Sequence, residues 1–76
     1  MRERLSGLRP GESGRVANIG IRGPMRRRLL DIGLTENARV ECVAQSPGGD
    51  PSAYLIRGAV IAIRGKDAAQ ILITRC

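Results

Sequence analysis

Four arginines near the middle of the chain are the side chains best suited to recognise another molecule. Arg22 is followed by the three consecutive arginines Arg26, Arg27 and Arg28. A guanidinium stays charged and binds carboxylates or phosphates through a planar fork of donors. On a helix, successive residues point about 100° apart, so the three adjacent arginines cannot all contact one group. The cluster indicates either a docking surface or a solvated helix face in which Arg27 or Arg28 pairs with Asp31.

Catalysis is not expected, because the sequence contains no histidine. A nucleophilic serine or cysteine needs a nearby base that accepts a proton near neutral pH. Every serine stands beside a glycine or a proline, as is typical of turns. The glycines do not form the phosphate-binding pattern that ends in Gly-Lys-Ser or Gly-Lys-Thr. We therefore expect a protein that is not an enzyme and holds no nucleotide or other cofactor.

The candidate metal ligands are few. Cys42 and Cys76 show no metal-binding or redox spacing, and Cys42 lies in an apolar segment where a buried thiol is the ordinary outcome. The sequence therefore predicts no metal site. Weak binding of ferrous iron to surface carboxylates such as Glu41 or Asp50 stays open, because oxygen ligands suit a divalent cation at modest affinity.

Length and composition favour one small basic domain over residues 1–76. Thirteen basic residues, twelve of them Arg, and seven acidic residues give a net charge of +6. The core must be aliphatic, since Tyr54 is the only aromatic residue. The charged start does not resemble a secretory signal, and no apolar run approaches the roughly 20 residues that cross a bilayer. We expect a cytoplasmic protein that does not insert into a membrane.

Turn signals and hydrophobic periodicity predict mostly short strands. Met25, Leu29 and Ile32 recur at helical spacing, so residues 24–32 are expected to form a helix that ends at Gly33. An extended segment is expected at 5–8 before a turn at 9–12, and a loop at 46–52. Strands are expected at 15–19, 38–45, 53–57, 59–64 and 71–74, with one helical turn at 66–70. Five or six strands with one inserted helix favour a small curved β-barrel over a sandwich.

The order of these motifs resembles the ferrous iron transport protein A (FeoA) family from Leu5 to Ile73. The resemblance is carried by the stretches 8–16 (LRPGESGRV), 25–35 (MRRRLLDIGLT), 49–51 (GDP) and 62–64 (AIR). It implies an SH3-like barrel and a partner, the ferrous iron transporter FeoB, which carries a cytosolic guanine-nucleotide-binding domain. A similar SH3-like domain ends the iron- and manganese-dependent repressors. This chain departs from the family in Asn37, where glycine is usual, and in lacking histidine.

The resulting hypothesis is a non-enzymatic accessory protein that binds and modulates FeoB from the cytosolic side. The expected partner-binding residues lie just before the helix, on the helix, and in the loop at 46–52: Arg22, Arg26, Arg27, Arg28, Pro47, Asp50 and Pro51. The alternative is a basic barrel that binds nucleic acid, because an isoelectric point near 11.0 attracts phosphate. Only Tyr54 could stack on bases, which disfavours that alternative. An exposed strand edge leaves a homodimer open.

Overall fold

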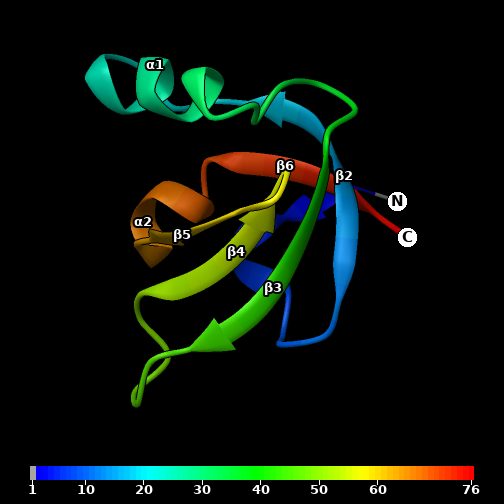
Figure 1. Ribbon diagram of the computed structural model, residues 1–76, viewed down its shortest axis with the longest axis vertical. Helices are drawn as coiled ribbons and strands as arrows, with labels where there is room; N and C mark the ends of the chain where they lie inside the picture. The colour runs from blue at the N-terminus through cyan, green and yellow to red at the C-terminus, as the bar shows by residue number, and fades with distance from the viewer. Residues whose placement is uncertain (1) are drawn as a thin grey trace.

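The computed structural model describes residues 2–76, and most of them lie in β-strands (Figure 1). Within these residues the elements are strand β1 (Arg2–Arg4), the 3₁₀ turn η1 (Leu5–Gly7), strand β2 (Ser13–Ile19), helix α1 (Pro24–Asp31), strands β3 (Arg39–Gln45), β4 (Ser52–Ile56) and β5 (Ala59–Ile63), helix α2 (Gly65–Ala68) and strand β6 (Ile71–Arg75). No helix in this part of the chain is long and apolar enough to cross a membrane.

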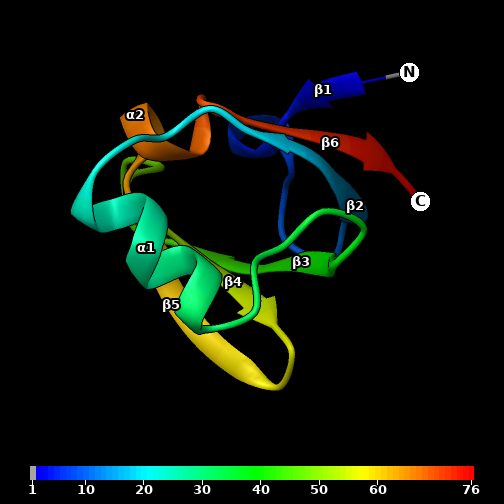
Figure 2. The same cartoon turned by 90° about the horizontal axis from the view of Figure 1, so that it is seen from above.

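The strands form one antiparallel sheet in the order β1-β6-β2-β3-β4-β5. The sheet bends around the interior of the molecule, as Figures 1 and 2 show. A closed barrel needs a hydrogen-bonded ladder all the way round. Over residues 2–76 the edge strands β1 and β5 are not paired with each other. The expected barrel is therefore observed as a curved six-stranded sheet with two edges.

The core is aliphatic, as the composition predicted. Inward positions alternate along the strands, for example Val40 and Cys42 on β3 and Ile71 and Ile73 on β6, all with fully buried side chains. Tyr54, the one aromatic ring, is 1% exposed and is among the largest side chains of this core. A domain this small buries a limited share of its surface, so each inward position contributes a large part of its stability.

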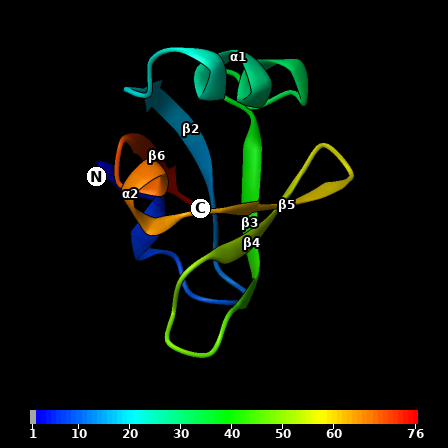
Figure 3. The ribbon, with the colours of Figure 1, turned by 90° about the vertical axis from the view of Figure 1, so that its left-hand side faces the viewer.

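Helix α1 lies across one end of the sheet (Figures 1 and 3). Pro24 occupies its first turn, where the missing N–H has no helical partner to lose. Leu29 is fully buried, and Met25 and Ile32 pack against the core from the same stripe. The predicted helix, its stripe and its packing are thus confirmed.

The end of α1 is a Schellman motif. Gly33 has φ of 99°, and its N–H donates to the carbonyl oxygen of Leu30 at 3.0 Å. The N–H of Leu34 donates to the carbonyl oxygen of Leu29 at 2.9 Å, and the side chain of Leu34 is buried. Asn37 then turns the chain into β3 with φ of 69°, so asparagine does adopt the left-handed conformation here.

The expectation of an extended segment at 5–8 was wrong. Leu5 begins a 3₁₀ turn, in which the N–H of Leu8 donates to the carbonyl oxygen of Leu5 at 3.1 Å. Side chains three residues apart point the same way in such a turn, so both leucines enter the core. The strand lies instead at Arg2–Arg4, where three charged residues give no hydrophobic pattern and pairing with β6 determines the structure.

Candidate functional site

Arg26 ties helix α1 to the sheet. One nitrogen of its guanidinium, Nη1, donates to the carbonyl oxygen of Ile19 at 2.7 Å and lies 3.4 Å from that of Ile21. The first carbonyl belongs to the last residue of β2 and the second to the connection between β2 and α1. Carbonyl oxygens are neutral, so Arg26 keeps its positive charge while it holds the helix in place.

All four arginines of the cluster, Arg26 included, are exposed. The ion pair of one alternative, between Arg27 or Arg28 and Asp31, is not formed: over residues 2–76 the ion pairs join Arg39 with Glu41, and Arg75 with Glu3 and Glu12. An arginine placed before an acid on a helix has the less favourable orientation, and exposed pairs gain little free energy. The outward face of α1 therefore carries arginines without a neutralising partner on the helix.

Leu30 adds an apolar side chain to this outward face. Its exposed fraction is 37%, and it lies three residues after Arg27, on a neighbouring ridge of α1. Interfaces between proteins commonly combine an apolar centre with arginine at the rim. The exposed side of α1 has that composition.

The loop between β3 and β4 is a compact turn whose acid has a structural partner. The N–H of Gly49 donates to the carbonyl oxygen of Ser46 at 2.7 Å, and the N–H of Ser46 donates to that of Pro51 at 3.1 Å. Asp50 accepts a hydrogen bond at Oδ1 from the N–H of Gly65, at 2.8 Å. Gly65 is the first residue of α2, so a distant acid supplies the cap that this helix lacks locally.

The two predicted contact regions lie at opposite ends of the molecule. Figures 1 and 3 show α1 across one end of the sheet and the β3–β4 loop, with Pro47 and Pro51, beyond the other. The predicted contact residues of both regions are exposed. Arg22, Arg27 and Arg28 therefore lie at the α1 end of the molecule, away from the β3–β4 loop.

The ion pairs of Arg75 with Glu3 and Glu12 lie at neither of these surfaces. The N–H of Arg9 donates to Glu12 Oε1 at 2.8 Å, and this bond, with the guanidinium of Arg75 nearby, holds the pKa of Glu12 below its usual value. Arg75 also donates from Nε to Glu3 Oε2 at 3.1 Å. These contacts join the two ends of the chain to the turn before β2.

The described residues give no cluster suited to a metal ion. Within residues 2–76 no three His, Cys, Asp or Glu side chains come together, so the expectation of at most weak metal binding stays a prediction. Cys42 is fully buried, as predicted, and burial raises the pKa of its thiol. Cys76 is exposed. Of the two acids named above as weak candidates, Glu41 pairs with Arg39 at 3.3 Å.

The burial of Tyr54 bears on nucleic-acid binding. Its ring faces the interior from β4, and burial raises the pKa of its hydroxyl. Single-strand binders stack bases on exposed aromatic rings. This chain presents no such ring, since Tyr54 is its only aromatic residue.

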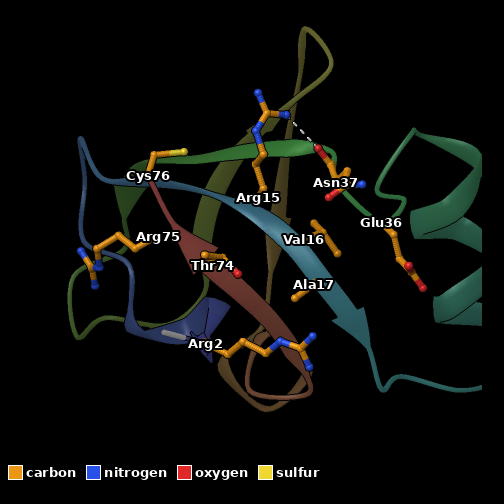
Figure 4. A pocket seen from close by; sticks show the side chains of 9 residues that line it. All are labelled: Arg2, Arg15, Val16, Ala17, Glu36, Asn37, Thr74, Arg75 and Cys76. Carbon is orange, nitrogen blue, oxygen red and sulfur yellow. Dashed lines mark hydrogen bonds between the residues drawn. The ribbon is translucent and has the colours of Figure 1, made fainter.

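A second group of arginines was missed from the sequence. Arg15, Arg39 and Arg57 line an open hollow of about 380 Å³ on the outer face of the sheet. A neighbouring hollow of about 530 Å³ shares Arg15 and Asn37 with it (Figure 4). The three arginines stand far apart in sequence, so no local motif marks them. The sequence did offer one signal: arginine stands at outward positions of two strands and in a hairpin turn.

Three proteins illustrate what this chain is similar to. A fusion of Fe(2+) transport protein A with the Fe(2+) transporter FeoB, from Porphyromonas gingivalis, is 32% identical over 68 residues, which are 90% of this chain and 8% of the fusion. The FeoA protein of Chlorobium tepidum superposes with a TM-score of 0.90 at 29% identity, over 95% of this chain and 69% of that one. The zinc complex of Stenotrophomonas maltophilia FeoA, a prokaryotic SH3 domain protein, gives 0.82 at 25% identity, over 93% and 88%.

The comparisons agree with the sequence motifs on one family. The family model of the FeoA domain matches residues 3–75, nearly the whole chain. The matched region includes the Schellman-capped helix and all of the strands after β1. The sheet is SH3-like, as it is in the Stenotrophomonas relative. This chain belongs to the FeoA domain family.

Proposed function

We propose that this protein is a non-enzymatic accessory of ferrous iron uptake that binds a FeoB-type transporter from its cytosolic side and modulates it. The observation that carries the proposal is the Porphyromonas gingivalis protein, in which the FeoA part and the FeoB transporter form one polypeptide. This chain spans 8% of that fusion, so it corresponds to the FeoA part alone.

A covalent link supports association on physical grounds. Joining two modules replaces a bimolecular encounter with an intramolecular one, at effective concentrations that reach the millimolar range for short linkers. A weak contact between the modules then forms without a large interface. A separate FeoA chain must make the same contact from free solution, so its docking surface needs groups that attract and orient the partner.

The outward face of α1 is the docking surface that we favour. Arg22, Arg27 and Arg28 are exposed, and Leu30 adds an apolar contact at 37% exposure. Exposed charges raise the rate of encounter with an oppositely charged patch, while a central apolar side chain contributes to the lifetime of the complex. An acidic patch on the partner is the chemistry that fits this face.

The β3–β4 loop is a second and separate candidate. Pro47, Asp50 and Pro51 are exposed, yet Asp50 already accepts the hydrogen bond of Gly65. Principal extents of 28 × 26 × 22 Å make the domain small enough for one partner to reach both ends. We rank the loop second because its acid would meet an acidic patch with the wrong sign of charge.

The test is an NMR titration of the isotope-labelled chain with the purified cytosolic domain of the FeoB from the same organism, at physiological salt. We expect shifts that saturate and cluster on residues 22–34. Shifts confined to residues 46–52 would move the docking surface to the loop. Shifts only with DNA, lost steeply as salt is added, would favour the nucleic-acid alternative.

A matched pair of variants separates the helix surface from general charge. The double variant Arg27→Glu and Arg28→Glu should abolish binding and leave the melting transition unchanged, because both side chains are exposed. Arg4→Glu with Lys66→Glu changes the net charge equally at exposed positions of β1 and α2 and should keep most of the affinity. Equal loss of binding in both would show that overall charge, and not α1, determines association.

A further inference from the structure

Three arginines form a row across the outer face of the sheet. Arg15 of β2 stands directly opposite Arg39 of β3 in the strand register. In the β3–β4 register Val40 faces Ile56, which places Arg57 one step beyond that pair, next to Arg39. Like charges directly opposite one another destabilise a sheet. The row therefore has a cost that the fold itself does not require.

Two guanidinium groups of this row are held by neutral carbonyl oxygens, and the third is paired with a carboxylate. Arg15 donates from Nη1 to the carbonyl oxygen of Asn37 at 2.9 Å, and Arg57 donates from Nε to that of Gly33 at 3.2 Å. Each guanidinium has five N–H donors, so most of them stay available. Glu41 pairs with Arg39 alone, at 3.3 Å. Of the three positive charges in the row, only that of Arg39 has a carboxylate partner within residues 2–76.

The hollow that these arginines line holds no acidic residue. It has a volume of about 380 Å³, and its apolar surface comes from Ala38 and Leu55. Glu41 is not part of the lining although it pairs with Arg39, and the neighbouring hollow has one acid in its lining, Glu36. The hollow is therefore lined by guanidinium donors from three separate segments and by no carboxylate.

Two strained backbone positions border the same hollow. Asn37, with φ of 69°, and Arg57, with φ of 47°, are the non-glycine residues with positive φ within residues 2–76, and both line it. Arg57 and Gly58 form the two-residue turn between β4 and β5, where Asn or Asp normally precedes glycine. A left-handed arginine costs about 1–2 kcal/mol. In this conformation the guanidinium of Arg57 donates from Nε to the carbonyl oxygen of Gly33.

We propose that this hollow, the Arg15–Arg39–Arg57 hollow, binds a compact multivalent oxyanion such as the diphosphate group of a small molecule. Forked donors match phosphate and carboxylate oxygens, and several forks around one site favour an anion with more than one charge. Binding would also relieve the repulsion between Arg15 and Arg39. The inference does not rest on the proposed function, because none of these arginines lies on α1.

The experiment follows the arginine Nε–Hε and backbone amide signals of the full chain during titration with pyrophosphate, and separately with citrate, at physiological salt. We expect saturable shifts at Arg15, Arg39 and Arg57. Arg39→Gln removes one fork and breaks only an exposed ion pair, so it should weaken pyrophosphate binding about tenfold, as expected for losing hydrogen bonds to a charged group. Arg4→Gln makes the same change of charge on β1, outside the hollow, and should change the affinity less than twofold.

The two probes distinguish the source of the oxyanion. Tighter binding of pyrophosphate assigns the hollow to phosphate, equal binding assigns it to compact oxyanions in general, and both results support the proposal. Without either anion, Arg39→Gln should melt at the same temperature or higher, because it removes a like-charge contact. No saturable shift with either probe at millimolar concentration, or equal weakening in Arg4→Gln and Arg39→Gln, would overturn the proposal.

Discussion

The two ends of this domain use the same small set of turn-forming and charged residues to different effect. At the α1 end, Gly33 stops the helix, Arg26 ties it to β2, and the neighbouring arginines are left exposed. At the other end, the β3–β4 loop also has glycines with positive φ, yet its one acid, Asp50, bonds the start of α2. Within residues 2–76, the arginines beside Arg26 at the α1 end thus form no ion pair, whereas Asp50 at the loop end is hydrogen-bonded to α2.

In this domain, residue type does not indicate role. Arg26 and Arg27 are adjacent, and only Arg26 reaches backbone carbonyls of the preceding strand. A helix turns by about 100° at each residue, so the side chain of Arg26 can reach back to β2 while that of Arg27 points in another direction, although both are exposed. A surface that recognises a partner should be sought among the charges that the fold does not use.

The largest expected effect separates the glycines of the two ends. Gly33→Val and Gly48→Val both place a β-branched residue at positive φ, 99° and 92°. At Gly48 nothing lies within 4 Å of an added Cβ, whereas at Gly33 that Cβ would lie 2.5 Å from Cδ of Arg57. We expect losses of about 3 kcal/mol at Gly33 and about 1–2 kcal/mol at Gly48, measured by urea unfolding.

The difference between the two variants has an identifiable source. Arg57 must move to admit the new side chain at Gly33, and it then loses its hydrogen bond to the Gly33 carbonyl oxygen. A typical hydrogen bond contributes about 0.5–1.5 kcal/mol. Gly33→Val combined with Arg57→Ala should therefore cost less than the sum of the two single variants. Equal losses in Gly33→Val and Gly48→Val would show that only backbone conformation matters at the end of α1.

A smaller effect distinguishes the anchored arginine from the free one. Arg26→Gln shortens the side chain and leaves the carbonyl oxygen of Ile19 without its donor, so we expect a loss of about 1 kcal/mol. Arg27→Gln removes the same charge from an exposed position and should stay within about 0.5 kcal/mol of the parent protein. Thermal unfolding of the two variants, side by side, measures the difference. Similar melting temperatures would mean that Arg26 is no more anchored than Arg27.

Most of the fold followed from short-range sequence signals. The helical stripe at Met25, Leu29 and Ile32 and the glycine stop at Gly33 are local features, and both were confirmed. The strand at Arg2–Arg4 could not be predicted, because three charged residues acquire their structure from pairing with β6. The sheet order and its open edges likewise depend on contacts between distant strands.

The candidate site was less accessible to sequence reasoning. Arg27 and Arg28 stand out in the sequence as part of a run of arginines, and both are exposed on α1. Their role in binding a partner stays a prediction. The hydrogen bond of Asp50 to Gly65 spans fifteen positions and has no local signature. The row of Arg15, Arg39 and Arg57 depends on strand register, which a one-residue slip would have moved to the other face of the sheet.

The smallest expected effect is a pH dependence at the loop end of the sheet. The N–H of Arg9 and the guanidinium of Arg75 favour the charged form of Glu12, so its pKa is lower in the folded protein than the usual value of 4.5. Above about pH 4.5 the carboxylate is charged in both states and its stabilisation is fully present; the stabilisation is lost as pH falls through the lowered pKa.

Glu12→Gln measures this contribution, and Glu36→Gln is the matched control at the α1 end of the β2–β3 pair. The melting temperature of Glu12→Gln should lie below that of the parent protein at pH 7, and the two should converge below about pH 4.5. Glu36 is exposed, so its replacement controls for the loss of one surface carboxylate. Added salt should reduce only the part that comes from Arg75, because the backbone N–H of Arg9 carries no net charge for ions to screen. A difference for Glu12→Gln that persists unchanged below pH 4 would assign the effect to the shape of the turn and not to the charge.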